Sequence, residues 1–130
     1  MKLLLDTHIW IWASLSPEKL SRKVQRELSR PSNEQYVSPV SIWEARLLER
    51  RGRFRLRPTF DRWVSDALAP PILEAPFTFQ VGMIAGGVNL PQSDPGDVFV
   101  AATALTYDLT LVTADEQLLA CSWLKTLANE

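Results

Sequence analysis

Four acidic residues of this 130-residue chain stand within apolar segments or at their ends: Asp6, Glu44, Asp97 and Asp115. Carboxylates that lie a few ångströms apart raise each other's pKa, and a divalent cation removes that repulsion. Mg²⁺ and Mn²⁺ prefer oxygen ligands and commonly bind a few carboxylates while a substrate phosphate completes the shell. If these acids meet in the fold, they can hold a metal that activates water for in-line cleavage of a phosphodiester.

Each acid also has a structural interpretation. Asp6 and Asp115 precede helical patterns, where aspartate is a favoured N-cap, so capping explains either residue alone equally well. Asp94 and Asp97 stand close together before an Ala-rich helical pattern, and one of them is expected to be the cap. Glu44 lies in an apolar helical pattern, where an unpaired glutamate is rarely buried; the alternative is a solvated face of that helix.

Short apolar strands are expected to bring two of the acids to one edge of a sheet. Residues 2–5 form a strand that ends at Asp6, and residues 109–113 form another that ends just before Asp115. The carboxyl ends of parallel strands are where α/β proteins bind ligands. The alternation of short apolar runs with helical patterns predicts a single α/β domain over residues 1–130, with a central parallel sheet of four to five short strands flanked by helices.

Apolar periodicity and capping residues predict the other elements. One helix is expected to begin at Ser16-Pro17, run unbroken through Val24 and stop before Pro31. The remaining expectations are helices over 7–14, 38–52, 60–69, 78–86 and 98–107, a loop over 87–96, a short helix after 115, and strands over 35–38, 72–75 and 124–127.

The composition is that of an ordinary soluble globular protein, with 46% hydrophobic and 22% charged residues. No apolar stretch reaches the roughly 18 residues of a membrane span. The apolar N-terminus is interrupted by Asp6 and His8 before it could serve as a signal peptide. Cys121 is the single cysteine, which excludes an intrachain disulfide and fits a reducing compartment. A cytoplasmic protein without a membrane partner is expected.

Four short strings carry a resemblance to a known family. They are LLDTH at residues 4–8, SIWE at 41–44, DPGD at 94–97 with AATA at 101–104, and LTLVTAD at 109–115. Together and in this order they resemble the PIN domain, and more narrowly the VapC-type toxins of bacterial toxin–antitoxin pairs. The resemblance implies a Mg²⁺ or Mn²⁺ site, endonucleolytic cleavage of RNA, a cognate antitoxin as partner and a homodimer.

The resemblance also assigns roles by position. The family's four acids correspond to Asp6, Glu44, Asp97 and Asp115, as catalytic metal ligands. The family's hydroxyl near the metal corresponds to Thr113, which is expected to orient water or phosphate. Two more residues, Thr7 and Asp94, are expected in supporting positions around the metal or substrate.

The chain departs from the family pattern beside the third acid. Many relatives have an arginine directly after that acid and a histidine or another basic residue shortly before the DPGD string. This chain has Val98 and Gln92-Ser93 in those places. The departure leaves the acids intact but puts in doubt a substrate or antitoxin contact made by basic groups.

His8, the single histidine, is expected to pack or to form an outer hydrogen bond, because a catalytic base needs direct reach to the nucleophile. Trp10, Trp12 and Trp43 lie in apolar helical patterns, so packing in the core or at a subunit interface is favoured over stacking on bases. Cys121 has no histidine partner and is expected to be a small buried apolar residue.

The net charge of −1 does not indicate a nucleic-acid binder, so any affinity for RNA must come from a local basic cluster. One cluster comprises Arg46, Arg50, Arg51, Arg53, Arg55 and Arg57. On a helix, Arg46, Arg50 and Arg53 would share a side and place their guanidinium groups near the acids. A solvated face, or a surface that docks an acidic antitoxin segment, is an equally good interpretation.

These observations favour a metal-dependent endoribonuclease that leaves 5′-phosphate and 3′-hydroxyl ends and is the toxin of a VapBC-type pair. A first alternative is a Mg²⁺-dependent phosphatase or phosphotransferase with Asp6 as nucleophile. A second is a non-catalytic PIN-like interaction module, which four retained acids argue against.

Overall fold

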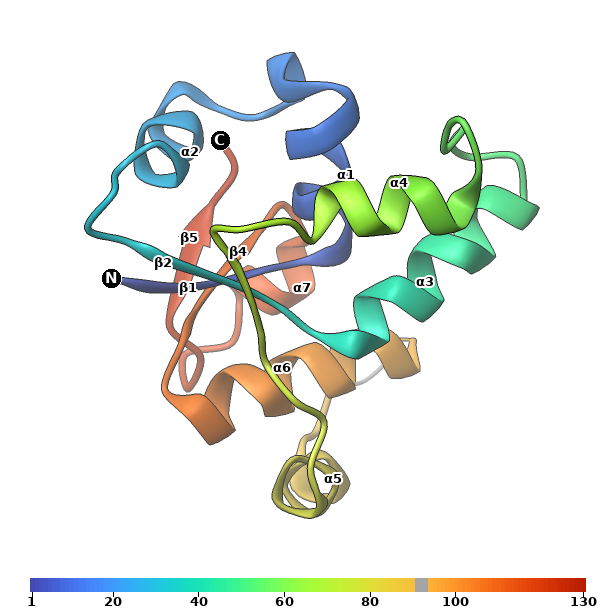
Figure 1. Cartoon of the computed structure of the whole chain (residues 1–130). Coiled ribbons are helices and arrows are strands. Elements are labelled where there is room, and N and C mark those ends of the chain that lie inside the picture. Colours follow the sequence, from blue (N-terminus) through green and yellow to red (C-terminus); the bar gives the residue numbers. More distant parts are fainter. Residues whose placement is uncertain (91–93) are drawn as a thin grey trace.

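The computed structural model describes residues 1–90 and 94–130. Within these residues, five strands form one sheet: β1 (Lys2–Leu5), β2 (Glu34–Val37), β3 (Ile72–Glu74), β4 (Thr110–Thr113) and β5 (Thr126–Ala128). Their order is β3-β2-β1-β4-β5, and every pair is parallel (Figure 1). The sheet confirms the predicted α/β class and the predicted number and direction of strands.

The strand order creates a switch point at the centre of the sheet. From β1 the chain adds β2 and β3 on one side, and it then crosses over to add β4 and β5 on the other. Ligand sites in open parallel sheets lie at the carboxyl ends of the strands that flank such a point. The register pairs Leu5 with Val112, so β1 and β4 end side by side. The residues that follow these two strands therefore share one crevice.

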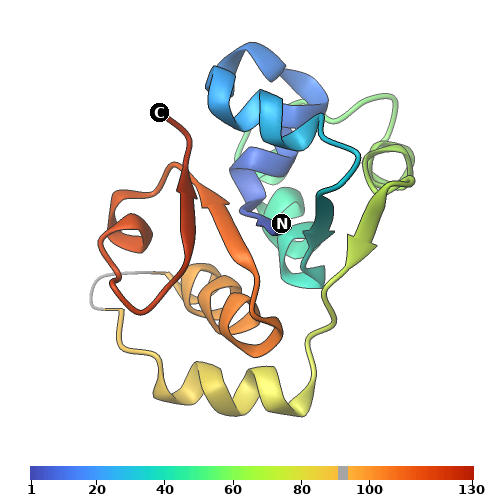
Figure 2. The ribbon, with the colours of Figure 1, turned by 90° about the vertical axis from the view of Figure 1, so that its left-hand side faces the viewer.

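Helices cover both faces of the sheet. The face with Leu3 and Leu5 packs against four helices: α1 (Thr7–Leu15), α2 (Arg22–Leu28), α3 (Pro39–Arg50) and α4 (Phe60–Ala67). The face with Leu4 packs against α6 (Pro95–Tyr107) and α7 (Glu116–Leu119). The remaining helix, α5 (Phe79–Gly87), lies against α6 (Figure 2). Burial on both faces explains why β1 is apolar at three successive positions.

Two tryptophans hold α1 against α4 and so help to position the N-terminal end of α1. Trp10 is 2% exposed, and its Nε1 donates a hydrogen bond to the carbonyl of Ala67 at 2.9 Å. The Trp10 ring lies 4.8 Å from the ring of Trp63, which itself donates to Ser14 at 3.0 Å. The buried polar nitrogens are thus satisfied, as the interior requires. The prediction of a packing role is confirmed for Trp10.

The prediction of one unbroken helix from Ser16 to the residue before Pro31 was wrong. A 3₁₀ turn (η1, Pro17–Lys19) is followed by extended backbone at Leu20, and Ser21 caps α2 by accepting from Val24 N at 3.1 Å. The side chain of Leu20 is 6% exposed in the core. The backbone N–H of Ser21 donates to Asn129 at 2.6 Å. Contacts with distant residues therefore interrupt a locally favourable helix.

The other boundaries agree with the predictions to within a few residues. The largest shift is at α6, which begins at Pro95 rather than Val98, because Asp94 caps it and proline occupies the first turn. Gly52, at the predicted end of α3, has the positive φ of 74° that favours glycine. The predicted loop over residues 87–96 lies partly outside the described residues, as do Gln92 and Ser93.

Candidate active site

Asp6 lies at the end of β1, at the switch point. Its Oδ2 accepts a hydrogen bond from the hydroxyl of Thr113, at the end of β4, at 2.6 Å. Its Oδ1 accepts from the backbone N–H of Thr7 at 2.9 Å. The Thr113 hydroxyl also accepts from the N–H of Asp115 at 3.0 Å. Because the single proton of Thr113 is donated to Asp6, we expect Thr113 to hold this carboxylate in place.

Glu44 is held by the start of α1. The Thr7 hydroxyl lies 2.6 Å from Oε1 of Glu44 and 2.8 Å from the hydroxyl of Ser41. A carboxylate accepts only, so Thr7 donates to Glu44 and accepts from Ser41. Thr7 and Ser41 are both buried, which keeps this chain of hydrogen bonds away from competing water. Thr7, which was predicted to have a supporting role, therefore contacts Glu44 directly.

The first turn of α6 brings in the third acid. Asp94 accepts from the N–H of Asp97 at 3.1 Å and is the cap, so Asp97 is the member of the pair that remains for the site. Gly96, between them, is buried against Glu44. A Cβ at position 96 would lie 2.6 Å from the carboxyl carbon of Glu44, closer than real Cβ atoms come to any neighbour. The absence of a side chain at Gly96 thus allows α6 to approach α3 at the acids.

Asp115 caps α7, accepting from the N–H groups of Gln117 and Leu118 at 2.8 and 3.2 Å. The capping interpretation is therefore correct for Asp115, and Asp6 also caps its helix. Capping does not remove either residue from the site, because the negative charges of Asp6 and Asp115 both raise the pKa of Asp97. Each acid combines a local structural role with a place in a shared electrostatic field.

The negative charges of the other acids act on Asp97. Burial, followed by the charges of Asp94, Asp115, Asp6 and Glu44, raises the pKa of Asp97 to about 7. Burial also raises the pKa of Asp6 against the hydrogen bonds from Thr113 and Thr7, and it raises the pKa of Glu44 against the hydrogen bond from Thr7. A site in which burial and mutual repulsion both oppose ionisation is one that a cation would stabilise.

The acids do not form a closed metal cage within the described part of the chain. Within residues 1–90 and 94–130, no three side chains of His, Cys, Asp or Glu are close enough to bind one metal ion together. Mg²⁺ usually keeps several waters and binds proteins through only one or two carboxylates, so it does not need a closed cage. The four acids provide only hard oxygen donors. The donor set therefore fits a hydrated Mg²⁺ or Mn²⁺ ion.

The structure corrects the prediction for the arginine cluster. Arg46 forms an ion pair with Glu49 at 2.6 Å and lies over the ring of Phe60, so its guanidinium contacts α3 and α4. The helix ends at Arg50, so Arg53 cannot share its side. Arg51 instead lines a cavity together with Glu44. Of the described ion pairs, none includes an arginine of the segment 50–57.

Three further predictions have mixed outcomes. His8 is exposed but packs its ring against Trp12 and Phe54, with centroids 5.6 and 5.9 Å away, as expected for a packing role. Trp43 is 52% exposed, which excludes the core alternative of its prediction; the alternative of a subunit interface stays a prediction. Cys121 is half-buried rather than buried, and its thiol donates to the carbonyl of Gln117.

Two residues with clear roles in the site were not predicted from the sequence. Ser41 supports Thr7, and its signal was its position three residues before Glu44, on the same side of α3. Gly96 allows the close approach of α6, and its signal was a glycine inside the string that contains Asp94 and Asp97. Neither signal is specific without the structure.

Comparison with known proteins agrees with this geometry. The PIN domain family matches residues 3–123. A relative, ribonuclease VapC22 of Mycobacterium tuberculosis (strain ATCC 25618 / H37Rv), is 31% identical over 119 residues, which cover 89% of this chain and 88% of the relative. The chain therefore belongs to the PIN domain family and, within it, to the VapC-type members.

Solved structures show the same fold at low sequence identity. The chain resembles one in a structure of VapBC2 from Rickettsia felis bound to a DNA fragment from their promoter, with a TM-score of 0.71, 17% identity and full coverage of both chains. It also resembles one in DNA-bound VapBC from Salmonella typhimurium, with a TM-score of 0.67, 18% identity and 98% coverage of both. Among the described residues of this chain, no helix is long and apolar enough to cross a membrane.

Proposed function

We propose that this chain is a Mg²⁺- or Mn²⁺-dependent endoribonuclease and the toxin of a VapBC-type toxin–antitoxin pair. The observation that carries the proposal is the raised pKa of Asp97, which burial and the charges of Asp94, Asp115, Asp6 and Glu44 bring to about 7. The relative VapC22 is a ribonuclease by name, and the similar solved structures are of VapBC complexes, which supports the RNA substrate and the antitoxin partner.

In this proposal the acids bind the metal, and two threonines hold two of the acids in position. One or two of the four acids would bind a hydrated metal ion directly and the others would contact its waters; the bound metal would supply an activated water and stabilise charge on the phosphate. Thr113 and Thr7 hold Asp6 and Glu44 in position, so that neither carboxylate must be reoriented when the substrate arrives. In the cytoplasm, an antitoxin that covers the acids would keep the enzyme inactive, and a homodimer would present two such sites.

The alternative functions are less well supported. A phosphotransferase would use Asp6 as its nucleophile. The match of residues 3–123 to the PIN domain family and the relative that is a ribonuclease by name favour a nuclease instead. A non-catalytic module would have no use for Asp97, an acid with a pKa raised to about 7 by burial and four neighbouring charges.

The chemistry of the product ends tests the proposal directly. A metal-activated water attacks the phosphate in line and displaces the 3′ oxygen, so the products should carry 5′-phosphate and 3′-hydroxyl ends. End-labelling of RNA cleaved by the purified protein in Mg²⁺ would identify them, with the Asp97→Asn variant as the control for a contaminating nuclease. A 2′,3′-cyclic phosphate on products that depend on the wild-type protein would exclude the mechanism.

Gly96→Ala is expected to reduce cleavage by about 10- to 100-fold, the usual loss when a group that positions a metal ligand is disturbed. The new methyl group would displace the Glu44 carboxylate from its hydrogen bond with Thr7. The matched control is Gly86→Ala, because a Cβ there has nothing within 4 Å. Initial cleavage rates and melting temperatures of both variants make the test, and wild-type activity in Gly96→Ala would show that Glu44 does not depend on this contact.

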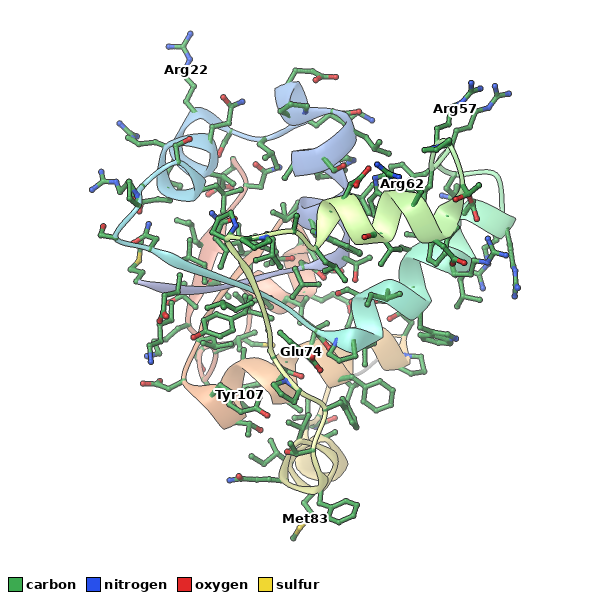
Figure 3. All side chains as sticks on the ribbon, viewed as in Figure 1. Arg22, Arg57, Arg62, Glu74, Met83 and Tyr107 are labelled. Atoms are coloured by element: carbon green, nitrogen blue, oxygen red, sulfur yellow. The ribbon has the colours of Figure 1, made fainter. Side chains whose placement is uncertain are left out.

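The arginines at the end of α3 and in the segment after it are expected to bind RNA phosphates. Alanine at Arg50, Arg53 and Arg55 should weaken binding of all RNA sequences alike and reduce the slope of log affinity against log salt by roughly 0.7 for each lost contact. The control is alanine at Arg22, Lys23 and Arg26 of α2; Arg22 and Arg57 lie at opposite corners of the molecule (Figure 3). An unchanged slope in the first variant would assign this cluster to the antitoxin or to solvent.

A further inference from the structure

A cavity of about 180 Å³ opens beside the acids, between α3 and the start of α6. Trp43, Leu47, Leu48 and Arg51 form its α3 side. Asp94, Pro95 and Gly96 of the α6 turn and His8 of α1 line the rest, and Glu44 belongs to both the cavity and the acidic site. A chain that places a phosphate at the acids would therefore pass the mouth of this cavity.

The spacing along α3 explains how one helix serves both places. Trp43, Leu47 and Arg51 are four residues apart and form one stripe of the helix. Glu44 and Leu48 form the adjacent stripe. Both residues line the cavity, and Glu44 also lies near the charges of Asp6 and Asp94. Because Trp43 and Glu44 are consecutive residues of α3, the helix fixes the position of the Trp43 ring relative to the Glu44 carboxylate.

The chemistry of the lining fits a flat, partly polar ring. Trp43 is 52% exposed, although large aromatic side chains are normally covered. Leu47 and Leu48 add apolar surface, and Arg51 is exposed and takes part in none of the described ion pairs. The volume is below the roughly 300 Å³ of the smallest sites for drug-sized ligands, so the cavity takes one ring system rather than a longer segment.

We propose that this cavity binds one unpaired nucleobase of the RNA, next to the phosphate that is cleaved, with Trp43 stacking on the base and Arg51 donating to its edge. The inference rests on the proposed ribonuclease function, because it takes RNA as the ligand. Proteins bind single-stranded RNA by splaying out bases onto aromatic rings and guanidinium planes. Because Glu44 lines the cavity, a base bound there would lie at a fixed distance from the acids. The bound base would therefore select which phosphate is cut.

The test compares Trp43→Ala and Trp43→Phe, with Trp123→Ala as the matched control. Trp123 is 43% exposed and lines a different cavity, with Met83 and Leu105. The probes are a fluorescein-labelled single-stranded RNA 10-mer of random sequence and a 10-mer of abasic ribose phosphates, with Ca²⁺ in place of Mg²⁺ to prevent turnover.

Trp43→Ala should weaken binding of the RNA 10-mer by about 5- to 140-fold, the range expected for one base stacked on an aromatic ring. It should leave binding of the abasic 10-mer unchanged. Trp43→Phe should recover most of the affinity, and Trp123→Ala should bind as the wild type does. An equal loss on both probes, or no loss on either, would overturn the proposal. So would a change in the sedimentation mass of Trp43→Ala with unchanged RNA affinity, which would assign the ring to a protein interface.

Cleavage in Mg²⁺ separates this inference from the function on which it rests. If the wild type cleaves RNA and Trp43→Ala cleaves and binds it equally well, only the base cavity is rejected. If the wild type does not cleave but binds RNA through Trp43, the nuclease function is rejected and the cavity remains an RNA site. If the wild type neither cleaves nor binds the 10-mer, both proposals are rejected.

Discussion

Excess EDTA is expected to abolish RNA cleavage by the purified protein, and added Mg²⁺ or Mn²⁺ is expected to restore it. The four acids supply negative charge and no group that could replace a cation beside the phosphate. Without a metal, the negative charges of these acids repel the phosphates of the substrate. A bound metal contributes several kcal/mol to the charged transition state, so its loss corresponds to a rate reduction on the order of a thousandfold or more.

The experiment needs a control for folding, because a chelator could also act on the structure. Circular dichroism in EDTA should show the wild-type helix content, since local caps and an apolar core hold the acid-bearing elements. Zn²⁺ is a useful comparison, because it prefers nitrogen and sulfur ligands and this site provides only oxygen. Cleavage that continues in excess EDTA, in a preparation whose Asp97→Asn variant is inactive, would refute the metal mechanism.

Asp97→Asn is expected to reduce cleavage by on the order of a thousandfold while it raises the melting temperature of the metal-free protein. The activity falls because a metal ligand is lost. The stability rises because asparagine removes one charge from a group of repelling carboxylates. Asp97 is half-exposed, so the gain is discounted for screening to about 1 kcal/mol, or about 4 °C.

The pH dependence of stability tests whether the charge of Asp97 causes the change in melting temperature. The pKa of Asp97 is raised from 3.8 to about 7, so between these values the folded protein holds a proton that the unfolded chain has lost. The contribution of Asp97 to the stability of the metal-free wild type should therefore be complete below about pH 3.8, fall as the pH rises from there to about 7, and change little above that. Asp97→Asn should show a smaller change, measured by thermal melts from pH 5 to 8. The same slope in both proteins would show that Asp97 is not the group responsible.

The other acids extend the comparison. Asp6→Asn, Glu44→Gln and Asp115→Asn should also lose most of their activity, and asparagine preserves a helix cap at positions 6 and 115. His8→Ala should keep substantial activity, because its ring packs on Trp12 and Phe54. Asp94→Asn should lose less than Asp97→Asn, since Asp94 caps α6. Metal-free variants that melt well below the wild type would mean that the acids are structural.

Local patterns determined a large part of this protein. β1 and β4 could be predicted because strands that are buried on both faces must be apolar at successive positions, as Leu3, Leu4 and Leu5 are. The caps of α3 and α7 could be predicted because an N-cap contacts a residue only two or three positions away. Asp6, Asp97 and Asp115 stand at element edges that the local sequence marks, whereas Glu44 lies inside α3 and was assigned by the family resemblance.

Only the tertiary structure decided how these parts meet. The hydrogen bonds of Thr7 with Glu44 and of Thr113 with Asp6 join residues 37 and 107 positions apart, and they depend on which strands become neighbours. The approach of Gly96 to Glu44, the break of the predicted helix at Leu20 and the exposure of Trp43 likewise follow from packing between elements. Sequence periodicity describes which face of an element is apolar, but the partner of that face is chosen by the whole chain.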